Sequence, residues 1–138
     1  MPGMTEVIRE LRGLNEPVPR PPRLPTEDEV GATEARLGVR FHEDYRRYLL
    51  KAGDVTYGTL EPAVVVPGAG YRSLAEVAET AWEHWGVPRG LLPICEDNAD
   101  YYCMNEAGEV VFWSHDGGTD ERWPNLATWI KRVWIEGN

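Results

Sequence analysis

Hydrophobic positions between residues 24 and 53 recur every three or four residues, the spacing of amphipathic helices, and predict two consecutive helices. Thr26 stands three residues before Glu29, which is the capping-box arrangement that begins a helix. Gly38 favours the left-handed conformation that ends the first helix. The apolar side of the second helix consists of Phe41, Tyr45, Tyr48, Leu49 and Ala52. No pattern in this segment is typical of an active site, so we interpret it as a scaffold.

The rest of the chain alternates short apolar runs with turn residues and further helical patterns. A short helix is predicted over residues 4–13, and five prolines within residues 17–25 predict an extended connector after it. The remaining elements that we expect are strands at 56–60 and 63–66, a helix from Ser73 to Trp85 opened by a second capping box of Ser73 and Glu76, a strand at 91–95, a hairpin of strands 100–104 and 109–114, and a helix over 125–135. A mostly antiparallel sheet with helices packed on one side makes this an α+β fold.

The chain length of 138 residues is that of one domain with a core of its own. We therefore predict a single domain over residues 1–138. Within it, residues 1–23 form an N-terminal helix and a proline-rich connector, and residues 24–138 form the core. Nothing in the sequence decides whether the domain forms homo-oligomers.

The charge balance is acidic, with 23 acidic against 14 basic side chains and a formal net charge of −9. Nucleic acid and anionic membranes are therefore disfavoured as partners, because binding to phosphate groups requires a basic surface. A basic protein partner fits, since complementary charge speeds encounter and rejects wrong partners. Solubility alone also explains an acidic surface.

The two cysteines, Cys95 and Cys103, stand in apolar or aromatic surroundings, where we expect each to act as a small buried hydrophobic side chain. The first residues carry no apolar leader segment, and no stretch reaches membrane-spanning length. We therefore expect a cytoplasmic protein with reduced thiols. As nucleophiles, with His115 as a base, these thiols are poor candidates because apolar surroundings raise the pKa of a thiol. No catalytic residue is assigned.

Two polar segments contain side chains of the types that bind metal ions. Carboxylates gather in the first, at Glu96, Asp97 and Asp100, and the second is the pair His115-Asp116. Oxygen ligands of this kind bind Mg²⁺ or Ca²⁺, so a metal-dependent hydrolase built on these five residues is one hypothesis. However, the spacing lacks the glycine and distal glutamate of a calcium loop, and the other histidines are isolated. We interpret both segments as turns and predict no metal and no cofactor.

Six tryptophans are many for a chain of this length, and tryptophan is favoured both in cores and at protein interfaces. Trp85 and Trp129 lie on the apolar faces of their predicted helices, which indicates core positions. Trp82, Trp123 and Trp134 lie off those faces and are candidates for exposure. Trp113, close to the pair His115-Asp116 at a strand end, is a candidate to line a shallow cleft.

An ordered set of short motifs extends over residues 24–134. It consists of Leu24-Pro25, Val30, Glu34, Leu37-Gly38-Val39, Phe41, Asp44-Tyr45, Leu49 and Gly53, then the segments 97–103, 108–116 and 126–129. In this order the motifs resemble the SUKH superfamily, which includes fungal cell-wall-assembly regulators and many bacterial toxin-immunity proteins. Three positions depart from the family pattern: His42 replaces a usual Pro, and Asp54 and Ala99 replace usual glycines.

The resemblance implies a protein-binding function without turnover. Its bacterial members suggest an immunity protein that neutralises a toxin domain, and the acidic charge suits a basic toxin such as a nuclease. Its fungal members suggest the alternative of a regulatory scaffold or adaptor without a toxin partner. For partner binding we select acidic side chains that pair with Lys or Arg, together with aromatic anchors. They are Asp97, Asp100, Asp116, Asp120 and Glu121, with Trp113 and Trp123 as the anchors.

Overall fold

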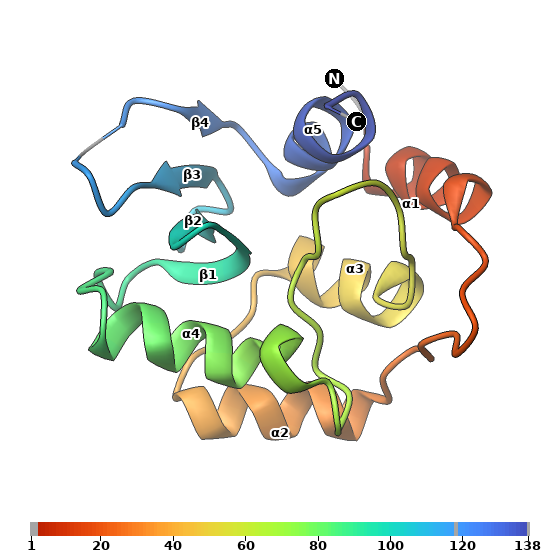
Figure 1. Cartoon of the computed structure of the whole chain (residues 1–138), viewed down its shortest axis with the longest axis horizontal. Coiled ribbons are helices and arrows are strands. Elements are labelled where there is room, and N and C mark those ends of the chain that lie inside the picture. The colour runs from red at the N-terminus through yellow and green to blue at the C-terminus, as the bar shows by residue number, and fades with distance from the viewer. Residues whose placement is uncertain (1–2, 118, 138) are drawn as a thin grey trace.

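The computed structural model describes residues 3–117 and 119–137, in which helices gather beside and beneath one small sheet (Figure 1). The helices and strands in chain order are α1 (Met4–Leu14), α2 (Glu27–Leu37), α3 (Glu43–Ala52), a 3-10 turn (Gly70–Arg72), α4 (Leu74–Glu83), β1 (Leu92–Asp97), β2 (Asp100–Met104), β3 (Val110–Trp113), β4 (Arg122–Trp123), α5 (Leu126–Trp129) and a π-helical segment (Ile130–Ile135). This arrangement confirms the α+β class predicted from the sequence.

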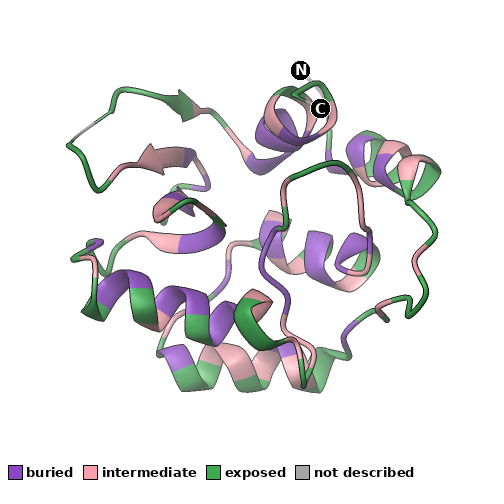
Figure 2. Ribbon diagram, in the orientation of Figure 1, coloured by how far each residue is buried: buried purple, intermediate pink, exposed green. Residues whose placement is uncertain are grey.

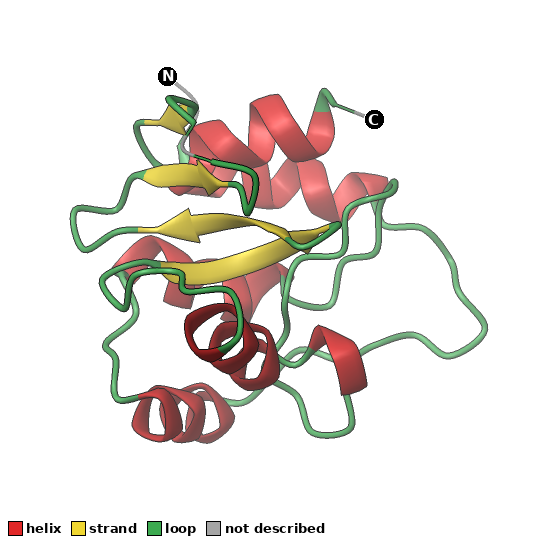
Figure 3. Cartoon of the chain, turned by 60° about the vertical axis from the view of Figure 1, so that its left-hand side comes forward, coloured by secondary structure: helices red, strands yellow, loops and turns green. Residues whose placement is uncertain are grey.

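The sheet has the strand order β1-β2-β3-β4, and each strand pairs antiparallel with the next. Figure 3 shows it at one side of the molecule, with helices behind and below. The predicted hairpin is present, because β2 and β3 pair from Tyr101↔Trp113 to Met104↔Val110. Two tight reversals therefore lie at opposite ends of the sheet, one between β1 and β2 and the other between β2 and β3.

Helix α2 has both of the boundaries that the sequence predicts. The Thr26 hydroxyl accepts the backbone N–H of Glu29 at 3.2 Å, and the Glu29 carboxylate accepts the backbone N–H of Thr26 at 2.9 Å. Arg23 donates to the same carboxylate at 2.7 Å. At the other end Gly38 has φ 68°, so it supplies the left-handed conformation that ends the helix.

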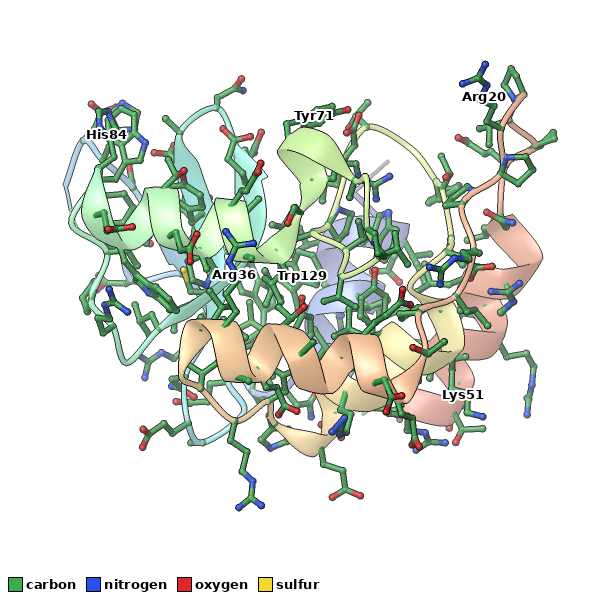
Figure 4. The ribbon with its side chains drawn as sticks, turned by 90° about the horizontal axis from the view of Figure 1, so that it is seen from below. Arg20, Arg36, Lys51, Tyr71, His84 and Trp129 are labelled. Carbon is green, nitrogen blue, oxygen red and sulfur yellow. The ribbon has the colours of Figure 1, made fainter. Side chains whose placement is uncertain are left out.

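The core lies where the helices meet the inner side of the sheet, and Figure 2 shows the buried positions turned inward. Helix α1 belongs to it, because Val7 and Leu11 are fully buried and α1 packs against α3 and α5. Helix α4 packs along β1, and α2 covers α4. Arg36 reaches from α2 to Glu79 of α4, with N and O atoms 2.8 Å apart (Figure 4).

The strands predicted at 56–60 and 63–66 are wrong. Ala63 donates one backbone hydrogen bond to Ile94 of β1, at 2.8 Å, and the chain then leaves the sheet. Val64 instead exchanges backbone hydrogen bonds with Arg72 and Leu74. Pro62 and Pro67 explain the difference, because a proline has no N–H to donate to a ladder. The segment therefore covers the β1 edge without extending the sheet.

The capping box predicted at Ser73 and Glu76 is also wrong. Ser73 is the N-cap residue of α4, but its side chain makes no capping hydrogen bond, and its backbone N–H bonds Gly70 of the preceding turn. The helix ends at Glu83, earlier than the predicted Trp85. The 3-10 turn thus leads directly into the helix, and the first N–H of the helix, that of Leu74, bonds the carbonyl of Val64 at 2.8 Å.

The assignments of three tryptophans need correction. Trp82 and Trp134 are buried, not exposed, and their indole N–H groups donate to the carbonyls of Leu91 and Tyr57, both at 2.9 Å. Conversely, Trp85 is only half-buried. Trp134 turns inward within the π-helical segment, whose wider turn rotates the apolar face relative to an α-helix. Trp129 is buried, as predicted.

Strand β4 has no counterpart in the sequence prediction. Its two residues pair with Val110 and Val111, and Phe112 donates a backbone hydrogen bond to Glu121 at 3.1 Å. A strand this short carries no periodic pattern, so only its neighbour β3 defines it.

Candidate protein-binding interface

One end of the sheet gathers four of the residues selected from the sequence. Asp97 and Asp100 face each other across the β1–β2 reversal, whose central residues Asn98 and Ala99 have φ 53° and 69°. Positive φ at both central positions defines the tight hairpin turn that matches the twist of the strands. Glu96 supports this turn by accepting the backbone N–H of Ala99 at 2.8 Å. The turn therefore presents both aspartates at the rim of the molecule.

Asp100 is linked to the end of β3 through His115. One oxygen of its carboxylate accepts the backbone N–H of His115 at 3.0 Å and lies 2.7 Å from Nδ1 of the ring. The hydrogen bond to Asp100 raises the pKa of His115 above its ordinary value. Desolvation would raise the pKa of Asp100, but the hydrogen bonds from His115 outweigh it and lower that pKa. An oxygen of Asp116 lies 3.4 Å from the other ring nitrogen, and this side chain is 84% exposed.

Aromatic rings border this end of the sheet. The ring of Trp85, just beyond α4, lies 5.3 Å from that of His115, and His84 packs edge-on against Trp85 at 4.9 Å. Trp113 is half-buried and lies 6.2 Å from Tyr101 on the neighbouring strand. Figure 4 places His84 at the end of α4. Acidic and aromatic side chains thus occur together at this rim, and aromatic residues are enriched at protein interfaces.

A cleft of about 240 Å³ continues the acidic surface on the other side of the β1–β2 turn. Its lining includes Glu61, Tyr71, Glu96 and Asp97, together with Arg72. Tyr71 is 77% exposed and donates its hydroxyl to Glu61 (Figure 4). We call Glu61, Tyr71, Glu96 and Asp97 the acidic cleft. Sequence reasoning missed Glu61 and Tyr71, since neither belongs to a motif and only the fold brings them beside Asp97.

The other three selected residues belong to β4 and to the segment that leads into it, beside the end of β3. Asp120 and Glu121 are exposed on the segment that leads into β4. Trp123 pairs with Val110 and is half-buried, with its ring 5.7 Å from that of Tyr102. Val110 and Trp113 are three positions apart on β3, so their side chains, and with them Trp123 and Trp113, face opposite sides of the sheet. The two tryptophan anchors therefore do not share one surface.

Burial disfavours the two thiols as nucleophiles. Cys95 and Cys103 are buried, and desolvation raises the pKa of Cys95 to about 12 and that of Cys103 further. Thiols with such pKa values carry almost no thiolate at neutral pH. Within residues 3–117 and 119–137, no three His, Cys, Asp or Glu side chains are arranged to hold a metal ion. The Asp100 carboxylate links the start of β2 to the segment after β3, because it bonds the backbone N–H and the ring of His115.

The comparisons with known proteins agree with this structure. The family model described as SMI1-KNR4 cell-wall, SUKH_5, matches residues 4–135, nearly the whole chain. The chain belongs to this SUKH family. The family is associated with protein binding, and the resemblance seen in the sequence motifs is thereby confirmed.

A solved structure is similar to this SUKH protein over almost its full length. It is the crystal structure of a protein from Pseudomonas syringae pv. tomato, which is 44% identical, with 96% of this chain and 98% of that chain covered and a TM-score of 0.90. No curated protein matches this chain significantly. None of the described helices combines the length and apolar character needed to cross a membrane.

Proposed function

We propose that this SUKH protein is a non-catalytic immunity protein of the cytoplasm that binds a basic toxin domain, such as a nuclease, and blocks it by stoichiometric occlusion. The observation that supports this proposal is the concentration of carboxylates around the β1–β2 turn. Asp97, Asp100 and Asp116 lie at one end of the sheet, and Glu61 and Glu96 continue the charge into the acidic cleft.

The carboxylates differ in their exposure and in the hydrogen bonds that they already make within the protein. Asp100 is engaged by His115, so it contributes mainly by shaping the surface. Asp116 is 84% exposed and available to a Lys or Arg of the partner. In the acidic cleft, Tyr71 offers a large exposed ring beside Glu61 and Asp97. An aromatic ring next to carboxylates fits a basic segment, since it provides apolar contact for the stem of a Lys or Arg and cation–π attraction for its head.

The first experiment is a pull-down from the native cell with the tagged protein at low and high salt. We expect one basic partner that is lost as salt rises, because exposed charge pairs are screened. A quantitative test follows by calorimetry with that partner. The triple variant Asp97→Asn, Asp100→Asn, Asp116→Asn is expected to bind about tenfold more weakly and with a shallower salt dependence.

The matched control removes three carboxylates elsewhere on the surface, with the variant Glu6→Gln, Asp28→Asn, Glu43→Gln. These residues are exposed and lie outside the acidic cleft. We expect this control to bind as the unmodified protein does. Equal losses in both variants would show that net charge alone acts, and unchanged binding with unchanged salt dependence in the first variant would exclude the surface. Tyr71→Ala tests the aromatic contact in the same assay.

The family description favours a second function, that of a regulatory adaptor that binds a cellular protein without any toxin, because it refers to the cell wall. The gene neighbourhood discriminates the two proposals. A toxin gene beside this one supports immunity, whereas an isolated gene and a recurring housekeeping partner in the pull-down support the adaptor.

A further inference from the structure

A second cavity, of about 490 Å³, lies away from the acidic cleft. Three loops enclose it: residues 38–42 between α2 and α3, residues 89–90 before β1, and residues 104–106 at the end of β2. No residue of the acidic cleft lines it. Its volume is within the range of pockets that bind small molecules, about 300–1,000 Å³.

The charge of this cavity is opposite to that of the protein as a whole. Arg40 and Arg89 both line it, against a single carboxylate, Glu106, in a chain of net charge −9. Neither arginine forms an ion pair with a carboxylate of the described residues. The Arg89 guanidinium lies 4.7 Å above the ring of Trp82, which holds it by a cation–π contact. Two guanidinium groups are therefore available to an anion in this part of the surface.

The rest of the lining is apolar or fixed by backbone contacts. Phe41 and Met104 are buried, and Leu92 is half-buried. His42 caps α3 by accepting the backbone N–H of Asp44 at its Nδ1, at 3.1 Å. The other side of this ring lies so close to the β2–β3 turn that a Cβ added to Gly108 would come within 2.5 Å of Nε2. This contact packs residues 38–42 against the β2–β3 turn, whose first residues line the cavity, so the fold itself holds these two walls together.

We propose that this cavity binds a small organic anion, whose carboxylate, sulfonate or phosphate group is held by Arg40 and Arg89 and whose apolar body lies on Phe41, Leu92 and Met104. The inference is independent of toxin binding, because different residues carry it. An arginine suits this role because its planar fork of N–H donors matches the oxygens of such anions.

The test is a fluorescence titration of the protein with 1-anilinonaphthalene-8-sulfonate, an aromatic anion. We expect saturable binding of one dye per chain, and the double variant Arg40→Gln, Arg89→Gln should weaken it by at least about tenfold, since charge-assisted hydrogen bonds are lost. Arg132→Gln is the matched control, because Arg132 is exposed on the C-terminal segment and does not line the cavity. The uncharged analogue N-phenyl-1-naphthylamine should bind more weakly than the anion.

Backbone amide shifts recorded by NMR during the titration locate the dye. Shifts confined to the neighbourhood of His42, Gly90 and Asn105 support the proposal, whereas shifts elsewhere overturn it. Equal weakening by Arg132→Gln, equal binding of the neutral analogue, or no saturable binding would also overturn it. Competition with benzoate and with adenosine monophosphate distinguishes a carboxylate ligand from a phosphate ligand. Displacement by hexaglutamate but by neither small anion would replace the proposal with an acidic peptide site.

The immunity proposal and the anion-binding proposal can be tested independently of each other. Arg40→Gln, Arg89→Gln is expected to leave the affinity for the basic partner unchanged, and the carboxylate triple variant is expected to leave dye binding unchanged.

Discussion

At the scale of single residues, the pair His115 and Asp100 shows how one contact joins two strand ends. Asp100 is at the start of β2 and His115 lies just beyond β3, so the pair closes the end of the sheet that carries the acidic surface. The sequence pattern led us to interpret His115-Asp116 as a turn, and no signal in it indicated Asp100 as the stronger partner of the ring. The register between β2 and β3 places Asp100 next to His115, so the fold determines this partner.

We predict that His115 titrates above its ordinary pKa of 6.5 and that Asp100→Asn lowers the value, because the ring then loses its hydrogen-bonded carboxylate. Asp116→Asn should lower it less, since that carboxylate is farther away, at 3.4 Å. The stability that protonated His115 contributes is complete below pH 6.5 and is lost as pH rises through the raised pKa. Ring-proton NMR titrations of the three proteins provide the values, and an ordinary pKa for the unmodified protein would contradict the prediction.

At the scale of elements, α2 and α4 begin with similar sequences, but different hydrogen bonds satisfy the N-terminal ends of the two helices. Thr26 and Glu29 exchange side-chain hydrogen bonds with each other's backbone N–H groups, whereas Ser73 makes no such bond. Both sequences contain the capping-box pattern, and the pattern alone cannot tell them apart. The 3-10 turn before Ser73 sets the entry to α4, and that turn depends on the contacts of Val64 with Arg72 and Leu74.

The two caps provide a matched pair of variants. Thr26→Ala is expected to lower the free energy of unfolding by about 1 kcal/mol, because it leaves a helix N–H without its acceptor. Ser73→Ala should change it by less than about 0.5 kcal/mol, since no capping bond is lost. Urea unfolding monitored by circular dichroism measures both. A loss at Ser73 as large as that at Thr26 would mean that the Ser73 side chain caps α4 in solution.

At the scale of the whole molecule, the N-terminal helix and the C-terminal segment complete one core. Leu11 of α1 is fully buried, and Lys131 bonds Glu10 at 2.8 Å. Figure 1 shows α1 beside α5, and α1 contacts both α5 and the π-helical segment. Residues separated by more than a hundred positions therefore stabilise each other, and we expect cooperative unfolding of α1 with the rest of the chain.

Leu11→Ala tests this cooperation. We expect it to lower the free energy of unfolding by about 2–5 kcal/mol, because it leaves a cavity in the common core. Arg9→Ala on the exposed side of the same helix should cost less than about 0.5 kcal/mol. Thermal unfolding followed both by tryptophan fluorescence and by circular dichroism should show one transition in each protein. A separate early transition for Leu11→Ala would mean that α1 unfolds independently of the core.

The sequence by itself determined those structural features that are set by residues close to one another in the chain. They are the helix pair with its cap at Thr26 and its end at Gly38, the β2–β3 hairpin and the α+β class. These features depend on local conformational preferences and on the periodicity of apolar positions, which act within a few residues. The sequence motifs also identified the family.

Only the tertiary structure decided which polar and aromatic side chains share a surface. It buried Trp82 and Trp134, whose indole N–H groups donate to the carbonyls of Leu91 and Tyr57, and it left Tyr71 exposed beside Asp97. It also placed Trp113 and Trp123 on opposite sides of the sheet. The physical reason is that burial and proximity depend on contacts between segments far apart in the chain, and no local pattern encodes them.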